Sequence, residues 1–128
     1  MSTKKNILII QKIHEEGIKL IKNNPNFEVE ITDDLSIENL KLKIKNADAI
    51  SIRTAKLLGE VIEDAKNLKI ISRHGVGYDN IDLKKAKEKN IKVTITADSN
   101  AVTVAEYVMF VLLNLAKRKN LYDKTVRD

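Results

Sequence analysis

Short apolar runs alternate with stretches of helical periodicity along most of this chain, and this alternation constrains the fold more than any other feature. The first run, KNILIIQ, is apolar almost throughout, which is typical of a strand buried on both faces of a sheet. Strand and helix repeated in this way predict an α/β fold: a parallel sheet of about five strands, helices on both faces, and right-handed crossovers. The predicted strands are residues 5–11, 27–31, 47–52, 68–72 and 91–96.

The predicted helices have recognisable ends. Pro25 stops the first helix, Ser36 is expected to cap the second, and Asp82 is expected to cap the helix before the fifth strand. Between the third and fourth strands, LLGEVIEDAKNL places its apolar residues on one helical face. The longest helix is predicted at about residues 101–119 and ends the fold. The tail of the chain, KRKNLYDKTVRD, mixes charges without apolar periodicity, and we interpret it as a linker or a frayed end.

Composition and charge exclude several classes of function. The net charge is +5, but the lysines are interspersed with acidic residues and no aromatic side chains alternate with them, which argues against a nucleic-acid partner. The chain has no cysteine, which excludes disulfides, thiol chemistry and cysteine metal sites. The most apolar segment, AVTVAEYVMFVLLNLA, is too short for a bilayer and carries Glu106 and Asn114. We therefore expect a soluble, cytoplasmic protein with no membrane partner.

A pair of glycines follows the fourth predicted strand, in SRHGVGYDNID. The pair is not a dinucleotide-binding fingerprint, which needs G-x-G-x-x-G directly after the first strand, where this chain reads QKIHEEG; here Asn80 also replaces the third glycine. In one interpretation, Gly75 and Gly77 both supply positive φ angles to a tight turn. In the other, a turn without side chains exposes the amides of Val76 and Gly77 to a small anion such as a carboxylate. The carboxyl end of a parallel strand, where open α/β sheets bind ligands, suits the second interpretation.

Two blocks of the sequence, GVGYDNID and NAVTVAE, resemble at their observed separation the D-isomer-specific 2-hydroxyacid dehydrogenases, and the similarity extends over about residues 5–120. The resemblance implies a flavodoxin-like substrate-binding domain of an NAD-dependent oxidoreductase that acts on D-2-hydroxy acids, of the D-3-phosphoglycerate or D-lactate type. It also implies a homodimer whose substrate is a small 2-hydroxy or 2-oxo acid. In this arrangement residues 1–100 are the N-terminal part of the substrate domain, 101–120 an interdomain helix, and 121–128 the start of a linker to an NAD-binding domain that is absent from this chain.

The same resemblance places catalysis outside the chain. The family's catalytic Arg, Glu and His, together with its NAD site, belong to the absent portion, and no metal is implied. Neither His14 nor His74 matches the catalytic histidine. The chain alone is therefore expected to be inactive, with no catalytic or cofactor-binding residue of its own.

Four residues of this chain are implied to bind substrate. Val76 and Gly77 match the loop whose amides hold the substrate carboxylate, Arg53 matches an arginine near the distal group of the substrate, and Asn100 matches an asparagine beside the substrate. Without the resemblance, Arg53 reads as a surface salt-bridge residue and Asn100 as a helix cap. The turn TITADSN lacks a proline that many members have, so the sequence does not name the hydroxy acid, although Arg53 favours phosphoglycerate.

Other interpretations of the chain lead to other classes of protein. The main alternative is a free-standing flavodoxin-like module that binds a small anion or a protein, with its long apolar helix as the interface. A phosphorylation receiver would use the acidic pair Asp33 and Asp34, but the third strand leads into Arg53 where a receiver needs its phosphate-accepting aspartate. We therefore predict a solvated turn for the pair, and a position near a helix start, not a metal, for His14.

Overall fold

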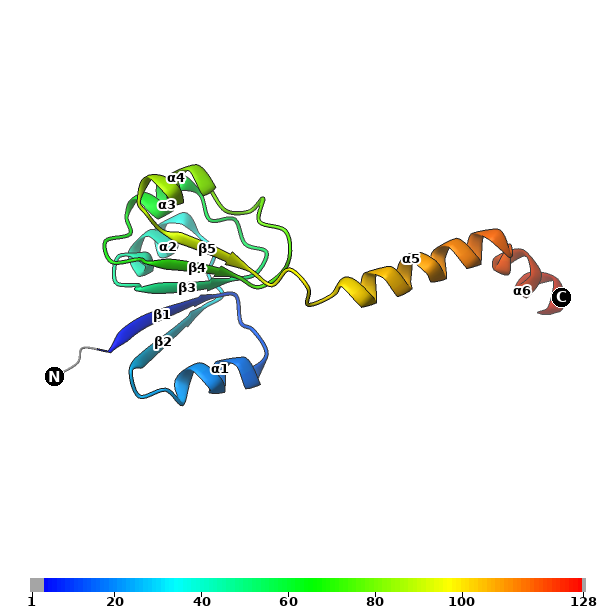
Figure 1. The fold of residues 1–128 in the computed structure, drawn as a ribbon, viewed down its shortest axis with the longest axis horizontal. Helices are drawn as coiled ribbons and strands as arrows, with labels where there is room; N and C mark the ends of the chain where they lie inside the picture. The colour runs from blue at the N-terminus through cyan, green and yellow to red at the C-terminus, as the bar shows by residue number, and fades with distance from the viewer. Residues whose placement is uncertain (1–3, 128) are drawn as a thin grey trace. The chain divides into compact units, whose positions relative to one another are not determined.

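The computed structural model describes residues 4–127, except for the side chains of residues 119–121. The chain divides into two compact units, Met1–Thr96 and Ala97–Asp128. The first is here called the sheet unit, because its five strands form one parallel sheet in the order β2-β1-β3-β4-β5 (Figure 1). This is the flavodoxin-like order, so the predicted fold class is confirmed. The strands are β1 (Lys5–Ile10), β2 (Phe27–Thr32), β3 (Ala49–Ile52), β4 (Ile70–Arg73) and β5 (Lys92–Ile95).

Helices cover both faces of this sheet. Helix α1 (Glu15–Lys22) lies on one face, while α2 (Ile37–Ile44), α3 (Gly59–Glu63) and α4 (Leu83–Glu88) lie on the other (Figure 1). The strand register aligns apolar side chains in rows across the second face, and these rows pack against the three helices. Each fully buried side chain of this kind contributes about 1.5–3 kcal/mol, so the sheet is a rigid base for the loops at its edge. The core includes Leu8, Ile10, Leu40, Ile44, Ile50, Ile52, Val61, Ile62, Ile71 and Ala86.

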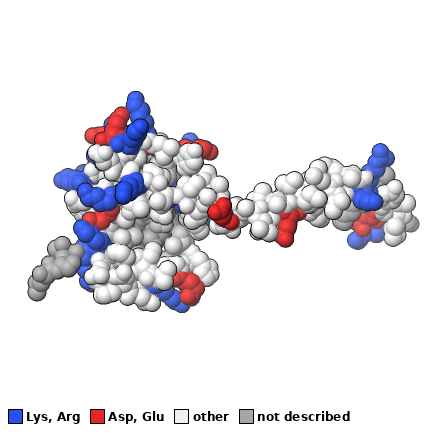
Figure 2. All heavy atoms as spheres, viewed as in Figure 1, with Lys and Arg blue, Asp and Glu red and all other residues white. Residues whose placement is uncertain are grey.

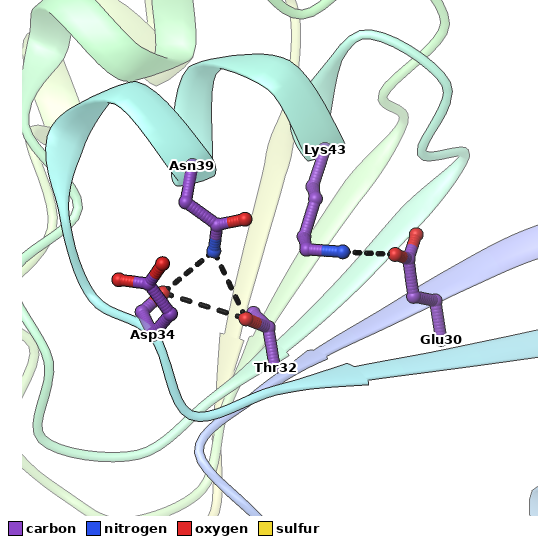
Figure 3. Close-up of polar contacts among 5 residues, drawn as sticks. All are labelled: Glu30, Thr32, Asp34, Asn39 and Lys43. Atoms are coloured by element: carbon purple, nitrogen blue, oxygen red, sulfur yellow. Dashed lines mark hydrogen bonds and ion pairs between the residues drawn. The ribbon is translucent and has the colours of Figure 1, made fainter.

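Polar contacts join α2 to the edge strand β2 (Figure 3). The side-chain amide of Asn39 donates to Thr32 Oγ1 at 3.0 Å and to the Asp34 carbonyl at 2.8 Å. One turn further along the helix, Lys43 forms an ion pair with Glu30 on the strand. These contacts satisfy the buried hydroxyl of Thr32 and fix the helix against the strand.

Ser36 occupies the N-cap position of α2, as predicted. Its side chain makes no capping hydrogen bond, however, so the predicted side-chain cap is wrong. The preceding Asp34 explains this, because its carboxylate accepts from the Ser36 amide at 3.0 Å. Hydrogen bonds from the amide and hydroxyl of Ser36 hold the pKa of Asp34 below its ordinary value. Asp33 likewise accepts from the Lys12 amide at 2.9 Å, and both aspartates are exposed, as the predicted solvated turn requires.

The ends of α3 and α4 are fixed by the segment that follows β4. Asp82 caps α4 as predicted, since its carboxylate accepts from the Lys85 amide at 2.9 Å. The helix predicted from LLGEVIEDAKNL is shorter than its apolar periodicity indicates. Leu57 pairs instead with Ile81 in an isolated parallel bridge, and its amide donates to the Asn80 carbonyl at 2.7 Å.

The second unit contains two helices where one was predicted. Helix α5 (Ala101–Ala116) ends before residue 119 because Arg118 adopts a positive φ of 48°. The tail, interpreted from sequence as a linker or frayed end, forms helix α6 (Lys119–Arg127), in which Arg127 pairs with Asp123 at 3.2 Å. An ion pair with this i,i+4 spacing supports a helix.

Helix α5 differs from every helix of the sheet unit in its surface. None of its residues is buried, although its sequence is almost wholly apolar. Figure 2 shows positive and negative side chains interspersed over the sheet unit and few along α5. None of the helices in residues 4–127 has the length and apolar character that crossing a bilayer requires.

Candidate anion-binding site

The glycine loop, residues 74–78, begins where β4 ends at the carboxyl edge of the sheet. Its first half is tied to neighbouring segments. The His74 amide donates to the Ile52 carbonyl at 2.7 Å, and the Gly75 carbonyl accepts from the Thr96 amide at 3.0 Å. Gly75 itself has a φ of 143°, which residues with a side chain rarely adopt. The backbone up to Gly75 is therefore fixed by the ends of β3 and β5.

Arg73 explains why position 75 has no side chain. The Arg73 Nη1 donates to the His74 carbonyl at 2.7 Å, so the guanidinium folds back beneath the loop. A Cβ added to Gly75 would lie 1.3 Å from the same Nη1 atom. Position 75 thus requires glycine for two reasons: its positive φ angle, and the arginine side chain packed against it.

Gly77 differs from Gly75 on both counts. It is not among the residues with positive φ, and a Cβ added there would meet only Asp79 Oδ2, at 4.0 Å. Within residues 4–127, the amides of Val76 and Gly77 donate to no other group, and both residues are exposed. The tight-turn interpretation therefore holds for Gly75 but not for Gly77. Within the described residues of the sheet unit, no packing contact explains why position 77 lacks a side chain.

The arginine loop, residues 53–55, follows β3 and lies next to the glycine loop. Asn80 joins the two, since its side-chain amide donates to the Arg53 carbonyl at 3.2 Å and to the Ala55 carbonyl at 2.7 Å. In the sequence Asn80 was read only as a departure from the dinucleotide fingerprint, and this bridging function was missed. The only signal in the sequence was that Asn80 is a polar residue in a turn region. Its partners lie 25 and 27 residues away, so no local pattern indicates them.

The guanidinium of Arg53 is exposed, and its Nη1 donates to the Lys12 carbonyl at 3.3 Å. Among the residues that the structure describes, no carboxylate forms an ion pair with it. The ion pairs of the described residues therefore do not support the alternative interpretation of Arg53 as a surface salt-bridge residue. Among these residues, its positive charge has no carboxylate partner.

Asn100 belongs to the second unit, where it precedes α5. Its carbonyl accepts from the Val104 amide at 2.9 Å, but its side chain makes no capping hydrogen bond. The helix-cap interpretation therefore does not account for this side chain. Its predicted position beside a substrate stays a prediction, because Arg53, Val76 and Gly77 lie in the other unit.

Both histidines of the chain line a hollow between α1 and the ends of β3 and β4. Its volume is about 240 Å³, and its walls include Ser51 and Ser72 besides His14 and His74. The Nδ1 atom of His14 accepts from the Glu16 amide at 3.3 Å, so His14 caps α1, as its predicted place near a helix start requires. No group of three or more potential metal-ligating side chains forms anywhere in the described part of the chain.

The described residues do not fit a dinucleotide cofactor. Such a cofactor binds after the first strand, where glycines let its pyrophosphate approach the backbone. The turn after β1 contains no glycine, and the side chain of Gln11 fills it, with Oε1 accepting from the amides of Thr54 and Ala55 at 2.8 and 2.7 Å. The feature of the sheet unit that would suit a small anion is the pair of unused amides in the glycine loop, near the exposed Arg53.

An open parallel sheet with exposed backbone amides at its carboxyl edge is typical of α/β domains that bind small ligands, and comparison with known proteins narrows this class. The family described as D-isomer specific 2-hydroxyacid dehydrogenase, catalytic domain, matches residues 7–126. The chain therefore belongs to the D-isomer specific 2-hydroxyacid dehydrogenase family, as its two sequence blocks indicated.

Individual relatives agree with this assignment. The chain is 41% identical over 112 residues to D-3-phosphoglycerate dehydrogenase of Methanocaldococcus jannaschii, covering 87% of this chain and 21% of that protein. It is 41% identical over 106 residues to hydroxypyruvate reductase of Thermotoga maritima, covering 82% of this chain and 34% of that protein. This chain therefore spans only a minor part of the length of such relatives.

Solved structures show the same fold. The PH0520 protein from Pyrococcus horikoshii OT3 superposes with a TM-score of 0.84 at 34% identity, covering 98% of this chain and 37% of that one. The NAD⁺-bound 3-phosphoglycerate dehydrogenase of Entamoeba histolytica gives 0.76 at 30% identity, covering 88% of this chain and 39% of that one.

Proposed function

We propose that this chain supplies the substrate-binding loops of an NAD-dependent oxidoreductase that acts on the CH–OH group of D-2-hydroxy acids, of the D-3-phosphoglycerate or D-lactate type. One observation carries the proposal. The amides of Val76 and Gly77 are unused within residues 4–127, and Gly77 lacks a side chain although its backbone and surroundings would accept one. A ligand approaching these amides accounts for both facts.

The substrate carboxylate accepts hydrogen bonds from the amides of Val76 and Gly77. Hydrogen bonds to a charged group contribute about 1.5–3 kcal/mol each, which is enough to orient a small acid. Arg53 then attracts the group at the other end of the acid, and a phosphate suits its planar, permanently charged guanidinium. Holding both ends fixes the position of C2, which is the protein's contribution to rate through orientation.

NAD, which is bound in the related structures of 3-phosphoglycerate dehydrogenase and D-lactate dehydrogenase, would be the hydride acceptor and would be held by polypeptide outside the described residues. The catalytic Arg, Glu and His of the family are proposed to lie there too, so the chain alone binds acids without turning them over. Asn100, in the second unit, is also proposed to bind substrate. The active protein is proposed to be a homodimer, which light scattering of the longer polypeptide would check.

Calorimetric titration of the 128-residue chain tests this function. We expect D-3-phosphoglycerate or D-lactate to bind and NADH not to bind. Binding of NADH would contradict the proposed division of labour, and failure of both acids to bind would contradict the proposed substrate site. Addition of both NADH and hydroxypyruvate should give no oxidation of NADH by the chain alone.

A second function is favoured by the exposed apolar surface of α5. A free-standing module could bind a small anion through the glycine loop and a protein through this helix. The two functions differ in the longer polypeptide, since only the first predicts NADH oxidation that depends on added 2-oxo acid.

A further inference from the structure

Gln11, directly after β1, has an unusual backbone. Its φ is 68°, in the left-handed region that residues other than glycine rarely adopt. The amide of Gln11 donates to the Thr32 carbonyl at 2.9 Å, so the end of β2 holds this conformation in place. Glycine would adopt it without strain, which suggests that the position is occupied for its side chain.

That side chain connects the turn to the arginine loop. Its Oε1 accepts from the amides of Thr54 and Ala55 at 2.8 and 2.7 Å, and its Nε2 donates to Thr54 Oγ1 at 3.2 Å. Gln11 is partly buried, and the bond from the Ala55 amide is partly shielded from competition with water. One side chain thus holds two consecutive amides of the loop that carries Arg53.

The same turn also holds the head of Arg53. The Lys12 carbonyl accepts from Arg53 Nη1 at 3.3 Å, while the Lys12 amide donates to Asp33 at 2.9 Å. On the opposite side, Asn80 donates to the Arg53 carbonyl at 3.2 Å. The backbone of Arg53 is therefore held from two sides, and its guanidinium rests on a neutral carbonyl that does not neutralise its charge.

We propose that Gln11 is a positioning residue that fixes the direction of the Arg53 guanidinium, and that it thereby sets a preference for acids with a second anionic group. The inference rests on the proposed function, since it assumes that the carboxylate of the acid binds at Val76 and Gly77. It adds the residue that determines how the chain distinguishes a phosphorylated acid from its unphosphorylated counterpart.

The test compares D-3-phosphoglycerate with D-glycerate, which differ only in the phosphate. Dissociation constants are measured by calorimetry on the 128-residue chain and on its Gln11→Met variant, which keeps an unbranched side chain but loses the strong acceptor. We expect the variant to raise the dissociation constant of D-3-phosphoglycerate about tenfold, equivalent to about 1.4 kcal/mol. The dissociation constant of D-glycerate should rise less than about twofold. The matched control is Thr54→Val, which removes only the contacts of the Thr54 hydroxyl with Gln11 and keeps both amide bonds, so it should change either constant less than about twofold.

A double-mutant cycle separates positioning from general support of the fold. If Gln11 acts through Arg53, Gln11→Met should have no further effect on D-3-phosphoglycerate in an Arg53→Gln background. Should Gln11→Met fail to fold, Gln11→Asn replaces it, because asparagine tolerates positive φ and is one methylene too short to keep the two amide bonds.

The outcomes are distinguishable. If the unsubstituted chain binds neither acid, the proposed function fails. If it binds both, three results would overturn the inference about Gln11 alone: equal affinity for the two acids, equal weakening of both by Gln11→Met, or additive effects with Arg53→Gln.

Discussion

The sheet unit and helix α5 are built from similarly apolar sequence, yet they bury it in opposite ways. The central strands of the sheet unit contribute side chains such as Ile52 that are fully buried. In α5 every residue remains accessible, and Leu112 is 56% exposed. The comparison teaches that the sheet unit has a buried core of its own, made by residues of its own strands and helices. Stability should therefore respond more to truncations in that core than to truncations of exposed side chains in α5.

The largest expected difference lies between Ile52→Ala and Leu112→Ala. Truncating Ile52 leaves a cavity in a packed core and should lower the free energy of unfolding by about 2–5 kcal/mol. Truncating the exposed Leu112 should change it by less than about 0.5 kcal/mol. Urea denaturation followed by circular dichroism measures both, and similar losses for the two variants would contradict the comparison.

The two glycines of the glycine loop give the next largest effect. Gly75→Ala forces a strained φ and a collision with Arg73, so we expect a loss of about 1–3 kcal/mol of stability. Gly77→Ala meets no protein atom closer than 4.0 Å and should leave stability unchanged or raise it.

Gly77→Ala should weaken binding of the acid although it does not lower stability. The methyl group of Gly77→Ala would stand beside the amides that hold the carboxylate, so the dissociation constant for D-glycerate should rise about tenfold, or about 1.4 kcal/mol. Calorimetry on the folded variant measures this. Unchanged affinity would show that Gly77 is not beside the ligand.

The caps of α4 and α5 offer a smaller contrast between the two units. Asp82 accepts from the Lys85 amide, so Asp82→Ala should lower the free energy of unfolding by about 1 kcal/mol. Asn100 makes no side-chain capping bond, and Asn100→Ala should have an effect below about 0.5 kcal/mol. Equal losses in thermal or urea unfolding would mean that the two caps do not differ.

The smallest expected effect is the pH dependence due to Asp48 in the sheet unit. A hydrogen bond from the Asn6 amide, together with the contact to Lys5, lowers the pKa of this carboxyl. Because the folded pKa lies below the unfolded value of about 3.9, Asp48 stabilises the fold above that pH, and this contribution is lost as the pH falls through the folded pKa. The stability difference between the chain and its Asp48→Asn variant should therefore shrink between pH 5 and pH 2 by titration in urea. A difference that stays constant over this range would argue against the effect.

Sequence reasoning predicted the sheet well, because strands such as KNILIIQ are buried on both faces and show it in their composition. It overestimated the helix after β3, since Leu58 and Ala65 fit the apolar periodicity but lie outside α3. It misread the tail, which forms helix α6.

The candidate site could be only partly predicted. The loop that bears Val76 and Gly77 was located from the strand before it. The different roles of Gly75 and Gly77 depend on contacts with Arg73 and Thr96 that no local pattern encodes. Gln11 was missed for a similar reason, because the two amides that it binds lie 43 and 44 residues further along the chain.

The most direct measurement is an NMR titration of the ¹⁵N-labelled 128-residue chain with D-3-phosphoglycerate. If the backbone amides at the end of β4 bind the carboxylate, the signals of Val76 and Gly77 should shift most, in a saturable way, together with the side-chain signals of Arg53. Saturable shifts centred on His14 and His74 instead, or no saturable shift at Val76 and Gly77, would contradict the account.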